Sequence, residues 1–131
     1  MTKHQQFSFV ARSKSFYNAI QGILYVLQTQ HNAWIHASVS ITVCGAGMVL
    51  AITRTEWCLL ILCIIAVWTA EAFNTALECL TDLVSPEFHP LAGRAKDTAA
   101  SAVLIAAIGS VIVGALVFLP HIWLRFSVSA L

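Results

Sequence analysis

The sequence predicts an all-α integral membrane protein, with one helix at the membrane interface followed by three transmembrane helices. Three observations predict this class. Hydrophobic residues make up 59% of the chain. Charged residues make up only 10%, whereas an average soluble domain has roughly 25%. Apolar runs long enough to cross a hydrocarbon core of about 30 Å recur along the chain. The 131 residues fit a single membrane domain, 1–131.

The first predicted element is amphipathic. Between residues 15 and 30, apolar side chains recur at helical spacing, and polar residues such as Asn18 and Gln21 fall between them. This segment is too polar to span a bilayer, so we expect a helix that lies at the interface with its apolar face toward lipid or the bundle.

Three transmembrane helices are predicted after it, at residues 33–53, 57–84 and 98–119. The first two are separated only by Arg54-Thr55-Glu56, which makes them antiparallel. Ser85-Pro86 ends the second, because a residue before proline is disfavoured in a helix.

The positions of the basic residues predict the orientation. Cytoplasmic loops of membrane proteins carry an excess of lysine and arginine. The N-terminal segment and the 85–97 loop hold most of these residues, which places both in the cytoplasm. The basic residues on this side are Lys3, Arg12, Lys14, Arg94 and Lys96, and those on the other side are Arg54 and Arg125. The net charge of +1 provides no field for binding nucleic acid.

The second predicted span carries a stripe of polar side chains. Glu71, Asn74, Glu78 and Asp82 fall within about 80° of arc on one helix face and run toward its cytoplasmic end. Ionisable groups inside a membrane cost free energy and usually serve a function. Carboxylates in this position bind a metal, move protons or pair with buried cations. A structural polar network that holds the helices together remains an alternative at this point.

A second group of charged residues opens the third span. Lys96-Asp97 follows the 85–97 loop and lies on the same side of the membrane as Glu78 and Asp82. Carboxylates for a divalent ion, a lysine and a helix N-terminus are components that phosphoryl transfer requires. The chain has no Walker-type glycine loop, so a nucleotide site here would be of another kind.

These residues carry a family resemblance. The stretch from Glu71 to Asp82 resembles the central signature of the prokaryotic diacylglycerol kinase and undecaprenol kinase family, and the stretch from Gly93 to Ile105 resembles its second signature. Thr55-Glu56-Trp57 resembles the undecaprenol kinase branch. The likeness implies an ATP-dependent lipid kinase in the bacterial cytoplasmic membrane. It also implies a homotrimer whose active sites are shared between neighbouring subunits.

The resemblance also implies roles for individual residues. Glu71 would be the general base for the hydroxyl of a lipid alcohol, either undecaprenol, which is favoured, or diacylglycerol. Asn74 would help to orient it, and Glu78 would bind Mg²⁺. The remaining implied positions contact ATP or lie near it: Lys96 at the phosphates, Asp97 on the nucleotide, and Asp82, His89 and Tyr17 near the nucleotide pocket.

The chain departs from the family pattern at Gln30. Family members usually place a glutamate there as a second Mg²⁺ ligand, and glutamine keeps an oxygen but loses the charge. A catalytically altered or inactive family member is therefore one alternative. A small proton-coupled transporter is another, because such proteins also use an intramembrane carboxylate like Glu71. The transporter does not explain Lys96-Asp97.

Overall fold

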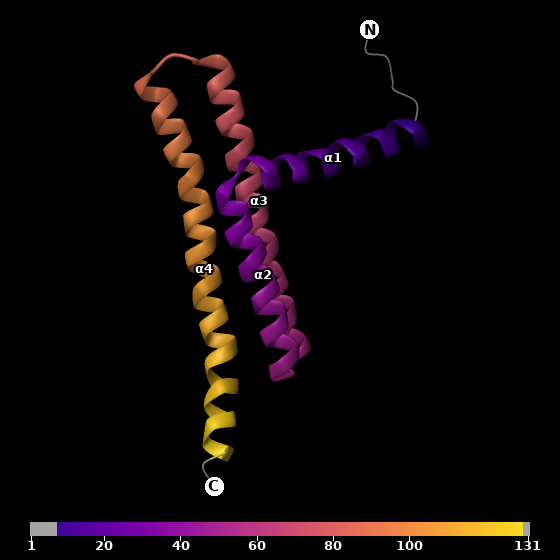
Figure 1. Cartoon of the computed structure of the whole chain (residues 1–131), viewed down its shortest axis with the longest axis vertical. Helices are drawn as coiled ribbons and strands as arrows, with labels where there is room; N and C mark the ends of the chain where they lie inside the picture. The colour runs from indigo at the N-terminus through magenta and orange to yellow at the C-terminus, as the bar shows by residue number, and fades with distance from the viewer. Residues whose placement is uncertain (1–7, 130–131) are drawn as a thin grey trace.

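All the regular secondary structure of the described residues is α-helical, as predicted. The computed structural model describes residues 8–129, so Lys3 of the basic N-terminal segment lies outside the described residues. Four helices follow one another in this part of the chain: α1 (Phe9–Thr29), α2 (His31–Leu50), α3 (Arg54–Val84) and α4 (Pro90–Ser129). Figure 1 shows α2, α3 and α4 running side by side along the long axis, while α1 projects sideways from the bundle.

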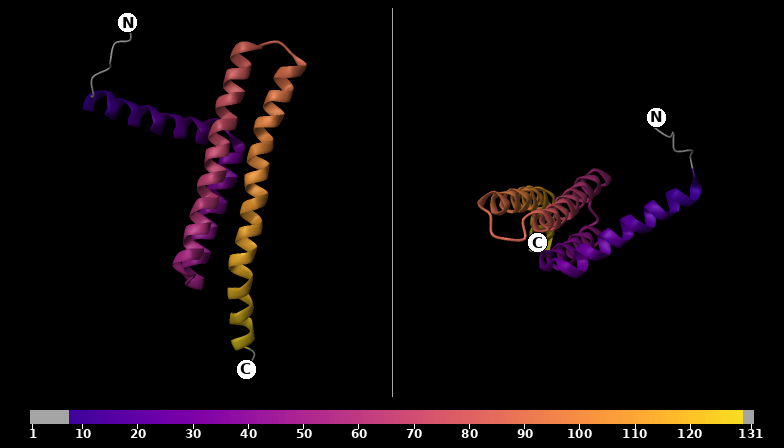
Figure 2. Two further views of the ribbon diagram at one scale, coloured as in Figure 1. Left: turned by 180° about the vertical axis from the view of Figure 1, so that it is seen from behind. Right: turned by 90° about the horizontal axis from the view of Figure 1, so that it is seen from above.

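Helix α1 starts earlier than the sequence pattern suggests. It begins at Phe9, because the Ser8 hydroxyl accepts a hydrogen bond from the Ala11 N–H at 3.4 Å and caps the first turn. Most of its apolar side chains are exposed, including Phe16, Ile20 and Ile23. A helix that projects from the bundle with exposed apolar residues suits a membrane interface (Figure 2).

Gln30 forms the corner between α1 and α2. Its backbone is extended (φ −102°, ψ 116°), so it ends one helix and caps the next. Its N–H still donates to the Val26 carbonyl at 2.9 Å. Because the corner is a single residue, the Gln30 side chain is held at the point where α1 meets the bundle.

The turn between α2 and α3 is also short and consists of residues 51–53. Ala51 adopts a left-handed conformation (φ 50°, ψ 48°) that costs a non-glycine residue about 1–2 kcal/mol. Thr53 and Glu56 then form a reciprocal capping box at the start of α3. Next to the turn, Ile52 and Leu60 form a small core with Val117 of α4, and this core offsets the cost of the turn.

Helix α4 is longer at both ends than the predicted span of 98–119. It begins at Pro90, whose fixed φ suits the first turn of a helix, so the connecting loop shrinks to residues 85–89. At the other end, the helix continues through Pro120 to Ser129. A proline inside a helix removes one backbone hydrogen bond, which transmembrane helices tolerate.

Three of the helices can cross a membrane. Mean hydropathy reaches 1.6 in α2, 1.8 in α3 and 2.8 in α4. Helix α3 has 31 residues and is therefore about 46 Å long, whereas the hydrocarbon core is about 30 Å thick. One end of α3 must therefore extend beyond the hydrocarbon. The end that holds Glu78 and Asp82 has a polar face suited to this.

Candidate active site

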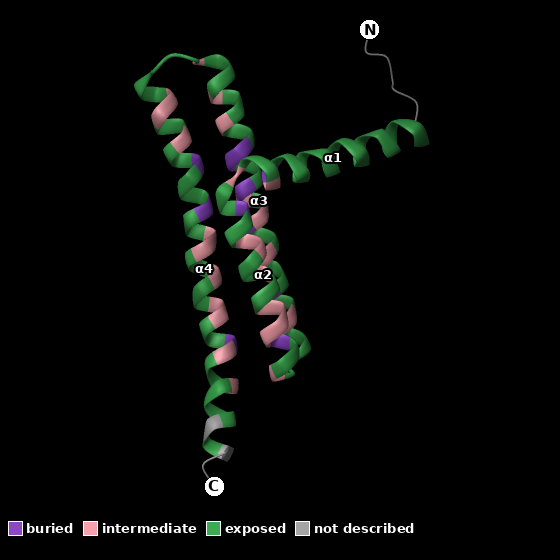
Figure 3. Ribbon diagram, viewed as in Figure 1, coloured by how far each residue is buried: buried purple, intermediate pink, exposed green. Residues whose placement is uncertain are grey.

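The buried polar residues of the described chain all lie on one face of α3. Glu71 is 1% exposed, Asn74 6% and Thr75 2%. Figure 3 shows buried segments of α3 near the level where α1 joins the bundle. The Thr75 hydroxyl donates to the Glu71 backbone carbonyl at 2.9 Å, so it does not occupy the Glu71 carboxylate. Buried polar groups normally have partners, which makes this cluster a candidate site.

Both carboxylate oxygens of Glu71 are buried and have no hydrogen-bond partner. The basic side chain within ion-pair distance is His36 of α2, whose Nε2 lies 3.8 Å from Oε2 of Glu71. That distance is too long for a hydrogen bond. An unpaired buried carboxylate is unfavourable for folding, so this group is available to accept a proton or a ligand hydrogen bond.

Two turns further along α3 from Glu71, two amides hold the Glu78 carboxylate. Asn74 Nδ2 donates to Glu78 Oε1 at 3.0 Å, and Gln30 Nε2 donates to Glu78 Oε2 at 3.1 Å. The corner residue between α1 and α2 therefore meets the polar stripe of α3. The structure brings together four of the residues singled out from the sequence: Gln30, Glu71, Asn74 and Glu78.

This group fits a divalent cation. Each amide carries an oxygen as well as the N–H groups, and rotation of the terminal amide would turn that oxygen toward the space near Glu78. The Oδ1 atom of Asn74 is buried and has no hydrogen-bond partner in the protein, so it is available as a ligand. Carboxylate and amide oxygens are ligands that Mg²⁺ accepts. No cluster of three or more His, Cys, Asp or Glu side chains occurs among the described residues. A cation at this place would therefore need the amide oxygens as well as the Glu78 carboxylate.

Lys96 lies at the polar end of the α3–α4 pair. Its Nζ donates to Asp82 Oδ1, which joins the start of α4 to the end of α3. The Lys96 side chain is 37% exposed and that of Asp82 66%, so this is a surface ion pair of small energetic value. A phosphate could therefore replace Asp82 as the partner of Lys96 at little cost.

Three other predicted residues are not brought into the cluster. Tyr17 lies on α1 and is 60% exposed. Asp97 is exposed on the first part of α4. His89 lies before α4, where its Nδ1 accepts a hydrogen bond from the Leu91 N–H at 3.2 Å. No contact in the described chain joins these residues to Glu71, Asn74 or Glu78.

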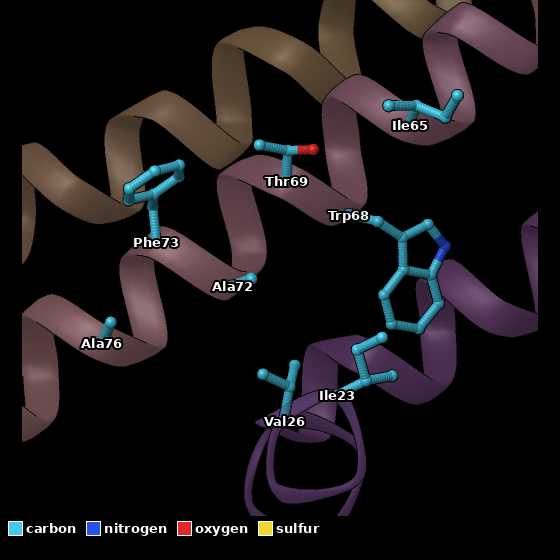
Figure 4. A pocket seen from close by; sticks show the side chains of 8 residues that line it. All are labelled: Ile23, Val26, Ile65, Trp68, Thr69, Ala72, Phe73 and Ala76. Carbon is cyan, nitrogen blue, oxygen red and sulfur yellow. The ribbon is translucent and has the colours of Figure 1, made fainter. Parts of the chain in front are cut away.

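An apolar groove lies where α1 crosses α3 (Figure 4). Its volume is about 530 Å³, and Thr69 is the polar residue among its lining side chains; the others are Ile23, Val26, Ile65, Trp68, Ala72, Phe73 and Ala76. On α3 these positions lie about 130° around the helix from Glu71. The groove can accommodate a hydrocarbon chain on a different face of α3 from the polar stripe.

The fold and site define a small integral-membrane lipid kinase, and comparison with known proteins supports this class. The chain belongs to the prokaryotic diacylglycerol kinase family, whose model matches residues 17–118. It is 38% identical to the undecaprenol kinase of Bacillus subtilis over 109 residues, which cover 83% of this chain and 89% of that protein. ATP is therefore the co-substrate.

Two relatives named diacylglycerol kinase match less of their own length. The protein from Synechocystis is 42% identical over 107 residues, 81% of this chain and 61% of the relative. The protein from Escherichia coli K12 is 42% identical over 71 residues, 54% of this chain and 56% of the relative. Each of these alignments leaves more of the relative unmatched than the alignment with the Bacillus protein does.

Proposed function

We propose that this kinase transfers the γ-phosphate of ATP to the hydroxyl of undecaprenol at the cytoplasmic face of the membrane. The observation that carries the proposal is the buried, unpartnered carboxylate of Glu71 beside Asn74 and Glu78. The 38% identity to the undecaprenol kinase of Bacillus subtilis, over 89% of that protein, supports undecaprenol as the substrate.

Glu71 has the environment of a general base. Its carboxylate would accept the proton of the lipid hydroxyl while the hydroxyl oxygen forms a bond to the γ-phosphorus of ATP. The bond between that phosphorus and the β,γ-bridging oxygen breaks, and ADP leaves with the electron pair. The burial of Glu71 excludes water from this point, which limits transfer of the phosphate to water instead of the lipid.

Other residues would hold the charged co-substrate. Lys96, released from Asp82, would contact the phosphates of ATP, and Asp97 would help to hold the nucleotide. Glu78, Gln30 and Asn74 would hold Mg²⁺, which neutralises phosphate charge when bound. The N–H groups of both amides contact the Glu78 carboxylate, so the three side chains lie together at the place where the ion would bind.

The proposal includes an orientation and an assembly. With the N-terminus and the α3–α4 loop in the cytoplasm of a bacterium, Glu78 and Lys96 face the compartment that contains ATP. In a homotrimer, a neighbouring subunit would complete each site. The separation of Asp97 and Tyr17 from the buried cluster within one chain supports a shared site of this kind.

Undecaprenol is expected to be phosphorylated at least tenfold faster than diacylglycerol at equal mole fraction in liposomes. The reason is the apolar groove between α1 and α3, which offers a chain-binding surface but almost no polar groups for a glycerol ester. The measurement is the initial rate of lipid phosphorylation with each alcohol alone and with both together. A faster rate with diacylglycerol would reverse the substrate assignment, and no product with either alcohol would refute the proposed function.

Gln30 favours one second candidate, a family member with altered metal dependence. In the structure the Gln30 amide donates a hydrogen bond to Glu78. Because this amide is neutral, Gln30 supplies no negative charge to a bound metal ion. The change Gln30→Glu is expected to lower the Mg²⁺ concentration for half-maximal activity roughly tenfold, because it adds a negative ligand.

The Gln30→Glu prediction is tested by Mg²⁺ titration of kinase activity. Gln28→Glu on α1 is a matched control that adds the same charge outside the cluster and should leave the titration unchanged. If Gln30→Glu also leaves the titration unchanged, Gln30 is not a metal ligand. If activity appears only in Gln30→Glu, the natural chain is the inactive member.

A further inference from the structure

His36 and Glu71 form an isolated pair inside the helix bundle. Nε2 of His36 lies 3.8 Å from Oε2 of Glu71, and both atoms are buried without a hydrogen-bond partner. Of the described residues, no other basic side chain lies within ion-pair distance of Glu71. The Glu71 side chain is 1% exposed and that of His36 16%, so water competes little for either group.

The contacts on both sides of this pair fix how α2 lies against α3. Gln30 contacts Glu78 on one side of it. On the other side, Trp68 Nε1 donates to Ser40 Oγ at 3.3 Å, and Ser40 Oγ donates to the His36 carbonyl at 2.7 Å. These contacts follow one another in antiparallel order along the two helices. Because these contacts hold α2 against α3, we expect side-chain rotation to bring His36 and Glu71 into hydrogen-bond distance while both helices stay in place.

The surroundings of His36 strengthen any contact that it makes. It lines a cavity of about 310 Å³ between α2, α3 and α4, whose walls are otherwise apolar apart from Ser40, Cys63 and Ser110. A hydrogen bond to a charged group is stronger in such a low-dielectric space than in water.

We propose that His36 is a positioning residue for the catalytic base. Its Nε2–H donates to the Glu71 carboxylate, turns that group toward the lipid hydroxyl and partly balances its charge. This inference rests on the proposed function, in which Glu71 is the base.

The test compares His36→Phe, which removes the N–H donor at similar volume, with His36→Gln, which keeps an N–H near the same place. His36→Phe is expected to lower kcat roughly 10- to 100-fold, which is what loss of a hydrogen bond to a charged group produces. The KM values for ATP and lipid should stay within about twofold, because the pair binds neither substrate. His36→Gln should recover most of kcat.

A matched control is available at the opposite end of the bundle. His121 Nε2 lies 3.0 Å from Glu56 Oε1, a histidine–carboxylate pair between α3 and α4. His121→Phe should leave kcat unchanged. A double variant supplies a further readout. The kcat of the double variant His36→Phe with Glu71→Gln should equal that of Glu71→Gln alone, because the effects of residues that act as a unit are not additive.

The outcomes separate this inference from the proposed function. If Glu71→Gln retains turnover, the base assignment and the role of His36 are both refuted. If Glu71→Gln is inactive but His36→Phe has normal kcat, the base assignment stands and the inference about His36 is wrong. An equal loss in His36→Phe and His36→Gln would show a packing role only. The elution volume in size-exclusion chromatography and the thermal unfolding temperature check that each variant folds and assembles. If His36→Phe does not fold, His36→Leu replaces it in the comparison with His36→Gln.

Discussion

Glu71→Gln is expected to lower kcat by about 10²- to 10⁴-fold, the range that general bases contribute. Glutamine has nearly the same shape but cannot accept the proton of the lipid hydroxyl. The protein should fold at least as well as the wild type, because a neutral amide replaces a buried, unpartnered carboxylate. The measurement is the rate of lipid phosphorylation at saturating ATP and lipid, together with thermal unfolding.

Glu87→Gln is the matched control for this change. Glu87 is an exposed glutamate in the loop between α3 and α4, and its replacement should leave kcat within about twofold, as for most surface substitutions. If Glu71→Gln loses activity and also has a lower melting temperature, Glu71 belongs to a structural polar network that holds the helices together. Full activity in Glu71→Gln would remove this residue from the mechanism.

Lys96→Met is expected to raise the KM for ATP and lower kcat, with a combined loss of about 10²- to 10³-fold in kcat/KM. A lysine that contacts transferring phosphates stabilises charge in the transition state as well as in the bound state. Loss of its ion pair with Asp82 should have almost no effect on stability, because both side chains are partly exposed.

The kinetic constants for ATP, measured at fixed lipid and Mg²⁺, provide the test of Lys96→Met. Arg54→Met removes a positive charge at the other end of α3 and should leave the KM for ATP unchanged. A Lys96→Met protein with normal constants would place the phosphates elsewhere. A loss restricted to thermal stability would show that Lys96 only joins α4 to α3.

The broad architecture could be predicted from the sequence because membranes impose simple rules. A long apolar run has few alternatives to a spanning helix, and the described part of the chain contains three helices of that kind. The ends of the helices were harder to predict. The cap at Ser8, the start of α4 at Pro90 and the continuation through Pro120 depend on local hydrogen bonds and packing, which hydropathy does not report.

The candidate site was predictable where its residues share one helix. Glu71, Asn74 and Glu78 lie on one face of α3 because of helical spacing alone. For partners on other helices, spacing alone was not enough. The family resemblance predicts Gln30 and Glu78 at the same Mg²⁺, whereas the contact of His36 with Glu71 required the fold. Ile35-His36 resembles part of the family's first block, but that likeness gives His36 no role and does not place it beside Glu71.

The polar stripe of α3 also explains why the Gln30 departure matters. Gln30 occupies the one-residue corner that brings α1, α2 and α3 together, so its side chain reaches Glu78 whichever oxygen or nitrogen it presents. As an amide donor it keeps the corner attached to α3. The position can therefore retain a structural contact even where metal affinity is reduced.

The most direct test of the account is the transfer of label from ATP to lipid. Wild-type protein in liposomes that contain undecaprenol receives ATP labelled at either the γ- or the α-phosphate, with Mg²⁺ present. The account predicts label in the chloroform-extractable lipid monophosphate from γ-labelled ATP alone, and none after Mg²⁺ is chelated. Label released only as inorganic phosphate, or no labelled lipid where the Bacillus undecaprenol kinase gives product, would contradict it.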